Sequence, residues 1–167
     1  MYKHWDEWVK TIPHSFVADF DGAQVTNIVD MLQDEPYEAP MKPFGGVESL
    51  AWAPDGKSVV YVSRKKTGMA YALSTNSDLY QYNLETKETK NLTEGMMGYD
   101  TNPRFSKSGR YLAWLSMERD GYESDMNRIF ILDMENGEKK HLTANWDYAV
   151  DQMAWSPNEK AIFFTAP

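Results

Sequence analysis

An eight-residue stretch, LAWAPDGK at residues 50–57, decides how this chain folds because it returns twice. It recurs as PRFSKSGR at residues 103–110 and as MAWSPNEK at residues 153–160, at offsets of 53 and 50 residues. Each copy leads into a short apolar run, such as VVYVS at residues 59–63. Pro-Asp-Gly and Ser-Gly favour tight turns, since Pro sets φ and Gly supplies a positive φ. Each copy therefore predicts two short strands joined by a turn.

A second pair of strands repeats at its own fixed offset. The segment LYQYNL at 79–84 matches IFILDM at 129–134, and KNLT at 90–93 matches KHLT at 140–143, both at an offset of 50 residues. The pattern appears once more upstream, where FVAD at 16–19 precedes a second short apolar segment. A period of about 40–50 residues with four strands is typical of a β-propeller blade. The apolar runs lack strict alternation, as expected for strands that are covered on both faces.

The sequence therefore predicts an all-β fold, a partial β-propeller with two full four-stranded antiparallel blades and two half-blades. We expect one domain, residues 1–167, divided into a half-blade at 1–44, a blade at 45–95, a blade at 96–144 and a half-blade at 145–167. The least regular part is the first half-blade. Its segment 25–33 fits a strand or a short helix, and residues 34–46, with three prolines and a Gly-Gly pair, read as a linker.

Composition excludes several classes of function. The net charge is −8 and no long basic cluster occurs, so we expect no nucleic-acid partner and no anionic membrane partner. There is no cysteine, which excludes disulfides and cysteine-based metal sites. No run of 18 apolar residues occurs, and residues 1–10 do not resemble a signal peptide.

Several segments resemble the propeller of the prolyl-oligopeptidase family of serine peptidases, in particular its acylaminoacyl-peptidase and dipeptidyl-peptidase 5 branch. They are WDEW at 5–8 with HSFV at 14–17, STNSDLY at 74–80, NLT at 91–93 and GYESD at 121–125, and they occur in family order. The resemblance covers essentially the whole chain. The turn of the repeat is shared with TolB-like propellers, so a non-catalytic propeller that binds a protein partner is the alternative.

The resemblance implies that this propeller works with a C-terminal α/β-hydrolase domain carrying Ser, Asp and His. No G-x-S-x-G nucleophile elbow occurs in the chain, so we expect the isolated chain to be inactive. The resemblance implies a serine peptidase for the parent protein, in which the propeller gates and recognises peptide substrates. It implies a periplasmic or secreted parent, with the cytoplasm as the alternative.

Propeller connectivity predicts where a binding surface would lie. Successive strands are antiparallel, so the loops between the second and third strands, at 4–13, 64–78 and 117–128, emerge on the same face. These loops hold the candidate substrate-binding residues, which are Asn76, Asp78, Tyr122, Glu123 and Asp125. In an aminopeptidase-like enzyme, a carboxylate on this face would bind the α-ammonium group of the peptide. The alternative is that these side chains cap turns and order their own loops.

The remaining polar and aromatic candidates favour structural roles. Trp5 and Trp8 flank two acids and fit either a peptide-binding surface or a gap between blades. The histidines, His4, His14 and His141, lack metal-ligand spacing, and we expect neither a metal site nor a cofactor.

The strand count also predicts a mode of assembly. Three blades' worth of strands cannot close a ring, because propellers have about 4–8 blades. The half-blades at the two ends leave strand edges unpaired, and such edges recruit complementary strands. We expect two copies to complete each other's half-blades in a six-bladed homodimer. The alternative is an open monomer with frayed ends, or aggregation through the same edges.

Overall fold

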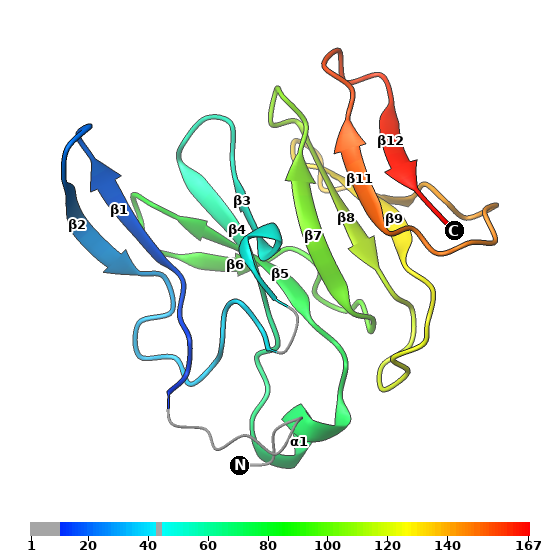
Figure 1. The fold of residues 1–167 in the computed structure, drawn as a ribbon, viewed down its shortest axis with the longest axis horizontal. Coiled ribbons are helices and arrows are strands. Elements are labelled where there is room, and N and C mark those ends of the chain that lie inside the picture. Colours follow the sequence, from blue (N-terminus) through cyan, green and yellow to red (C-terminus); the bar gives the residue numbers. More distant parts are fainter. Residues whose placement is uncertain (1–10, 43–44) are drawn as a thin grey trace.

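The computed structural model describes residues 11–42 and 45–167, and these residues form four antiparallel sheets that stand side by side in an arc (Figure 1). The first half-blade contains β1 (Phe16–Phe20) and β2 (Val25–Asp30). The first full blade contains β3 (Leu50–Trp52), β4 (Ser58–Ser63), β5 (Asp78–Asn83) and β6 (Thr89–Asn91). The second contains β7 (Asp100–Phe105), β8 (Tyr111–Ser116), β9 (Arg128–Asp133) and β10 (Lys139–His141). The last half-blade contains β11 (Gln152–Trp155) and β12 (Ile162–Thr165).

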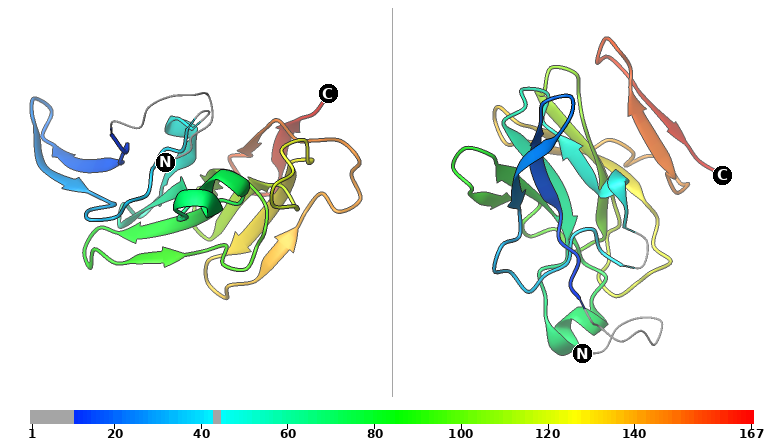
Figure 2. Two further views of the ribbon diagram at one scale, coloured as in Figure 1. Left: turned by 90° about the horizontal axis from the view of Figure 1, so that it is seen from below. Right: turned by 60° about the vertical axis from the view of Figure 1, so that its left-hand side comes forward.

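Each full blade is a meander in which neighbours in sequence are neighbours in the sheet. The strand orders are β3-β4-β5-β6 and β10-β9-β8-β7, and the terminal sheets are the pairs β1-β2 and β11-β12. This arrangement confirms the predicted all-β partial propeller. The two further views in Figure 2 show the blades fanning out without closing a ring.

The segment that fitted either a strand or a helix is a strand. Residues Val25–Asp30 form β2, which pairs with β1 from Phe20↔Val25 to Phe16↔Asp30. The helical interpretation is wrong, because four of these six residues are β-branched and the neighbouring strand offers a pairing edge.

The predicted turns hold the first two strands of each blade together. Gly56 and Gly109 take φ values of 70° and 78°, in the left-handed region that glycine tolerates. The third copy has Glu159 at this position, with φ of 59°. Its carboxylate accepts hydrogen bonds from the backbone N–H and the hydroxyl of Ser108, at 2.5 and 2.7 Å. The unusual residue of the third turn thus ties that turn to the neighbouring blade.

A threonine in each blade explains why the NLT and HLT segments repeat. The Thr93 hydroxyl accepts the backbone N–H of Leu79 at 3.0 Å, and the Thr143 hydroxyl accepts that of Ile129 at 3.0 Å. Both outer strands, β6 and β10, are only three residues long. The threonine side chain satisfies a strand N–H beyond the point where the backbone ladder of the short outer strand ends.

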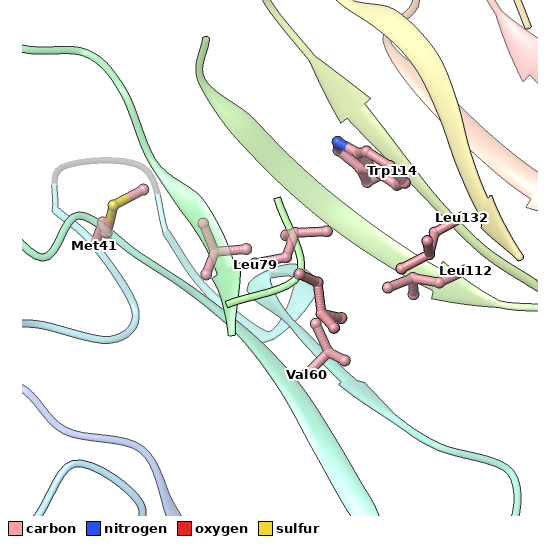
Figure 3. Close-up of a cluster of buried hydrophobic side chains, with 8 residues drawn as sticks. Met41, Val60, Leu79, Leu112, Trp114 and Leu132 are labelled. Atoms are coloured by element: carbon pink, nitrogen blue, oxygen red, sulfur yellow. The ribbon is translucent and has the colours of Figure 1, made fainter. Parts of the chain in front are cut away.

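The apolar cores lie between blades. The cluster between the two full blades contains Val60, Leu79, Leu112, Trp114 and Leu132, all of them buried (Figure 3). A second cluster joins the first half-blade to the next blade, and a third joins the last two sheets. Strands β4 and β8 are buried along almost their whole length, as expected for strands that are covered on both faces, whereas the first strand β3 is only half-buried and its Trp52 is exposed.

Two segments depart from the sequence-based expectation. The loop between β4 and β5 contains a six-residue helix, α1 (Gly68–Leu73), which no repeat predicted. The proline-rich linker is not an exposed tether, because Ala39 and Met41 are buried and the Ser63 hydroxyl donates to the Glu38 carbonyl at 2.9 Å. A short 3-10 helix, η2 (Val47–Ser49), leads directly into β3.

Candidate functional site

The loops that follow the second strand of each full blade emerge on the same face of the arc, along its lower edge in Figure 1. Residues 64–77 connect β4 to β5 and contain α1, and residues 117–127 connect β8 to β9 (Figure 1). The two loops contact each other, as the hydrogen bond between Ser74 and Asp120 shows. The third predicted loop, at 4–13, lies mostly outside the described residues.

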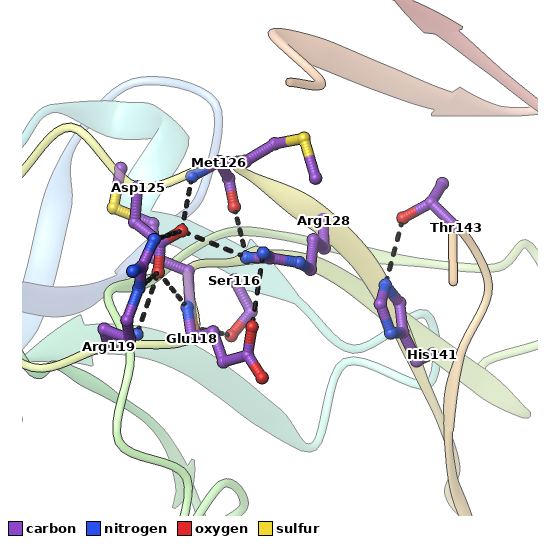
Figure 4. A network of polar contacts seen from close by, with 9 residues as sticks. Ser116, Glu118, Arg119, Asp125, Met126, Arg128, His141 and Thr143 are labelled. Atoms are coloured by element: carbon purple, nitrogen blue, oxygen red, sulfur yellow. Dashed lines mark hydrogen bonds and ion pairs between the residues drawn. The ribbon is translucent and has the colours of Figure 1, made fainter. Parts of the chain in front are cut away.

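Asp125 is the centre of the second loop (Figure 4). Its Oδ2 accepts the backbone N–H groups of Glu118 and Arg119 at 3.0 and 2.9 Å, and its Oδ1 accepts that of Met126 at 2.8 Å. The guanidinium groups of Arg119 and Arg128 lie 3.3 and 3.4 Å from Oδ1. The carboxylate is almost fully buried. Burial alone would raise the pKa of Asp125, but Arg119 and the backbone N–H donors outweigh it and hold the pKa far below its usual value.

Tyr122 and Glu123 occupy the exposed tip of this loop. The Arg119 guanidinium lies over the Tyr122 ring, 4.3 Å from its centroid. Glu123 is exposed and makes no hydrogen bond or ion pair within residues 11–42 and 45–167. Of the two acids in the GYESD segment, one is therefore occupied by its own loop and the other is available to a ligand.

The candidates of the first loop differ in the same way. Asn76 is buried. Its backbone N–H donates to Asp120, and its backbone carbonyl accepts the Arg64 Nε–H at 3.3 Å. Asp78 is half-buried, and its carboxylate accepts the hydroxyl of Thr93 at 3.1 Å within its own blade. Asn76 lies on one of the two contacting loops and Tyr122, Glu123 and Asp125 lie on the other, whereas the Asp78 carboxylate is engaged with the outer strand.

Sequence reasoning missed Asp120, which joins the two loops. Its Oδ1 accepts the Ser74 hydroxyl and the backbone N–H groups of Thr75 and Asn76, at 2.7, 2.8 and 3.1 Å. Lys66 lies 3.8 Å from Oδ2. The only sequence signal is the Asp120-Gly121 pair, which is typical of turns but names no partner forty-six residues away.

The histidines within the described residues contact protein groups. His14 Nδ1 lies 2.7 Å from Asp30 Oδ2. The His141 ring stacks on Phe130 with centroids 4.6 Å apart, and burial, with help from Arg128, lowers the His141 pKa. Trp5, Trp8 and His4 lie outside the described residues. Across 11–42 and 45–167, no three His, Cys, Asp or Glu side chains gather as metal ligands. The same part of the chain has no helix that is long and apolar enough to cross a membrane.

Comparison with known proteins identifies the family. The family described as the dipeptidyl peptidase IV (DPP IV) N-terminal region matches residues 25–167. Dipeptidyl-peptidase 5 of Porphyromonas gingivalis is 56% identical over 166 residues, which are 99% of this chain and 24% of that protein. Dipeptidyl-peptidase 5 of Schizosaccharomyces pombe is 29% identical over 163 residues, covering 92% of this chain and 23% of that protein. The chain thus spans about a quarter of the length of these relatives.

Solved structures support the fold. TolB from Acinetobacter baumannii superposes with a TM-score of 0.57 at 23% identity, covering 90% of this chain and 31% of that one. A putative TolB from Agrobacterium tumefaciens gives 0.55 at 18% identity, covering 84% and 42%. Identities this low show a shared propeller architecture and nothing of function.

The family match extends over most of the chain, includes both full blades and agrees with the architecture of the sheets. The G-x-S-x-G elbow of a hydrolase domain is absent from the sequence. This chain is a propeller segment that belongs to the dipeptidyl peptidase IV N-terminal region family.

Proposed function

We propose that this chain is the substrate-recognising and gating part of a serine dipeptidyl or acylaminoacyl peptidase whose chemistry is performed by a C-terminal α/β-hydrolase domain. The 56% identity to dipeptidyl-peptidase 5 over almost the whole chain supports this proposal. The alternative, a TolB-like propeller that binds a protein partner, is supported only by structural likeness at 23% identity.

Glu123 is the residue proposed to bind the α-ammonium group of the peptide. Its carboxylate is exposed and unpaired within the described residues, on a loop whose base is fixed by Asp125. An ammonium group that reaches this carboxylate gains a charge-assisted hydrogen bond. Tyr122 offers an exposed aromatic surface beside it. Asp125 and Asn76 then serve this site by ordering its surroundings, whereas Asp78 stabilises its own blade.

The test is the Glu123→Gln variant of the longer peptidase that carries this chain. Loss of one charged hydrogen bond is worth about 1.5–3 kcal/mol, so the KM for a dipeptidyl substrate with a free amino terminus should rise tenfold or more. The KM for the same substrate with an N-acetyl group should not change. Glu138→Gln is the matched control, because Glu138 is an exposed acid on the turn between β9 and β10. An unchanged KM for the free-amine substrate contradicts the proposal.

A second test addresses the division of labour. A fluorophosphonate probe should label one serine in the longer peptidase and none in the isolated chain. Stoichiometric labelling of a serine in the isolated chain contradicts the proposed arrangement. We further propose that the parent acts in the periplasm or outside the cell, as the family resemblance implies, and fractionation of the producing cells tests this.

We also propose that the isolated chain forms a homodimer by blade complementation. The supporting observation is a hollow of about 300 Å³ beside β12, lined by Ile131, Leu142, Ile162 and Phe164 among others. The first half-blade presents exposed apolar side chains of matching character, Phe16, Phe20, Val25 and Ile28. In the longer peptidase, following strands of the same chain would cover this hollow. Light scattering on the isolated chain tests the proposal.

A further inference from the structure

The tip that carries Glu123 is anchored on both sides by an aspartate. On one side, Asp125 gathers the backbone of Glu118, Arg119 and Met126. On the other side, Asp120 reaches out of its own blade and accepts three hydrogen bonds from the segment that follows α1. Only four residues, 121–124, separate the two anchors. The position of Glu123 is therefore set by both.

A second contact places the start of the tip against the neighbouring loop. The Gly121 N–H donates to the Thr75 hydroxyl at 2.9 Å. Gly121 has a φ of 76°, and a Cβ added there would lie 3.5 Å from the Leu73 carbonyl oxygen. The chain turns away immediately after this contact and leads into Tyr122 and Glu123. The beginning of the tip thus packs on the C-terminal end of α1.

The surroundings of the Asp120 carboxylate favour its charged form. Partial burial opposes ionisation, but the Ser74 hydroxyl, the two backbone N–H groups and Lys66 outweigh it and lower the pKa of Asp120. Asp120 is ionised at neutral pH, and charge-assisted bonds to one carboxylate oxygen are stronger than bonds between neutral groups.

We infer that Asp120 is a positioning residue: by clamping the 117–127 loop of one blade to the segment 74–76 of the next, it holds Glu123 where the substrate ammonium group binds. This inference rests on the proposed role of Glu123. A small displacement of a binding group lowers the reaction rate strongly, because a misplacement of about 1 Å lowers that rate by up to about a hundredfold.

The chain offers a sharp pair of variants for the test. Asp120→Ala removes the acceptor, whereas Asp120→Asn keeps an Oδ1 that can accept the same three hydrogen bonds, without the charge assistance, and loses the ion pair with Lys66. Asp21→Ala is the matched control, because Asp21 caps the β1–β2 turn by accepting the N–H groups of Ala23 and Gln24, each at 2.8 Å. Asp21 belongs to a different blade and to neither loop of the site.

The experiment measures KM and kcat of the longer peptidase with free-amine and N-acetylated versions of one dipeptidyl substrate. Asp120→Ala should raise the KM for the free-amine substrate roughly tenfold and leave that for the N-acetylated substrate unchanged. Asp120→Asn should bring the KM for the free-amine substrate most of the way back, and Asp21→Ala should match the unsubstituted peptidase. In parallel, hydrogen exchange should show lost protection of the Thr75 and Asn76 amides in Asp120→Ala alone.

The outcomes separate this inference from the proposal beneath it. If Glu123→Gln raises the free-amine KM but Asp120→Ala does not, Asp120 is not a positioning residue and the role of Glu123 stands. If Asp120→Ala impairs both substrates equally, its effect is general and the inference fails. Unchanged exchange at Thr75 and Asn76 also overturns it. If Glu123→Gln has no effect, the proposed ammonium site itself fails.

Discussion

The indole Nε1–H of Trp114 donates a hydrogen bond of 3.0 Å to Oδ1 of Asp100, and both side chains are fully buried between the two full blades. Trp114 belongs to the central cluster of apolar side chains, and Asp100 begins β7. Burial raises the pKa of Asp100 to about 7, and the nearby Asp78 carboxylate adds to this effect. The interface between the blades therefore contains a carboxyl group that prefers to be protonated.

This pair predicts how stability depends on pH. An aspartate in the unfolded chain loses its proton near pH 4, whereas folded Asp100 keeps its proton up to about pH 7. The folded state binds more protons in this window, so the contribution of Asp100 to the free energy of unfolding falls between pH 4 and 7 and is constant above it. Asp100→Asn keeps an acceptor for Trp114 and removes the titration.

The measurement is urea unfolding of the isolated chain and of Asp100→Asn at several pH values. From pH 4 to pH 8, Asp100→Asn should gain about 1–4 kcal/mol in free energy of unfolding relative to the unsubstituted chain. A difference that does not vary with pH contradicts the assignment of a raised pKa. Asp55→Asn is the control, because Asp55 is an exposed turn residue that accepts the Lys57 N–H.

The repeated threonines give a matched pair of substitutions. Thr93→Val and Thr143→Val each remove the acceptor of one buried strand N–H, that of Leu79 or Ile129. Each should lower the free energy of unfolding by about 1–3 kcal/mol, since a buried donor loses its partner. The two sites lie in different blades, so the double variant should show the sum of the two effects. Thr89→Val, at an exposed position of β6, should change stability little. Equal effects at all three positions contradict this explanation of the repeat.

Much of the fold follows from the sequence because the same local chemistry occurs more than once. The turns at Gly56 and Gly109 and the threonines of the NLT and HLT segments each recur at the repeat offset, so one copy supports the interpretation of the next. The helix α1 has no counterpart in the other blade. It is six residues long and is held by contacts of the loop rather than by its own pattern, and a helix this short has no sequence periodicity to detect.

The candidate site was predictable only in part. The GYESD segment drew attention to the loop at residues 117–127, but it does not tell that the Asp125 carboxylate accepts backbone N–H groups while Glu123 stays exposed. That difference depends on how the loop folds over one carboxylate. Asp120 escaped notice because its partners, Ser74 to Asn76, belong to another blade. The division of the chain at residues 44, 95 and 144 and the binding roles of the five candidates stay predictions.

A glycine between the full blades predicts a large and specific loss of stability. A Cβ added at Gly98 would overlap the carbonyl oxygen of Met117. The Gly98 carbonyl also accepts the Ser77 N–H at 3.2 Å, so this backbone cannot move away without breaking a contact between the blades. Gly98→Ala should therefore lower the free energy of unfolding by about 3 kcal/mol or more, measured by urea unfolding.

Gly95→Ala separates this overlap from the general cost of replacing glycine. Gly95 has a φ of 85° and no atom within 4 Å of an added Cβ, so its substitution carries only the conformational cost of about 1–2 kcal/mol. A Gly98→Ala variant as stable as Gly95→Ala would show that the segments at Gly98 and Met117, both in the second full blade, can separate without penalty, contrary to the prediction.

The hollow beside β12 predicts which residue controls assembly of the isolated chain. Leu142 lines it and is 47% exposed, although its backbone N–H is fixed to the Ile129 carbonyl at 2.8 Å. In the proposed dimer, Phe16 and Ile28 of a second copy would cover this surface, since the opposite face of that half-blade is already packed through Val17 and Val29 against its own neighbouring blade. A charge at Leu142 would then be buried against apolar side chains without a partner, which is costly.

Light scattering should give a mass of twice 19.3 kDa for the isolated chain at micromolar concentration and 19.3 kDa for Leu142→Asp. Val47→Asp is the control, because Val47 is 70% exposed in η2, outside the hollow, and this variant should stay dimeric. Unchanged urea unfolding of monomeric Leu142→Asp at low concentration shows that the substitution acts on association and not on the fold. If the unsubstituted chain is monomeric at every concentration measured, blade complementation is contradicted. If Leu142→Asp still forms a dimer, the two copies meet at another surface.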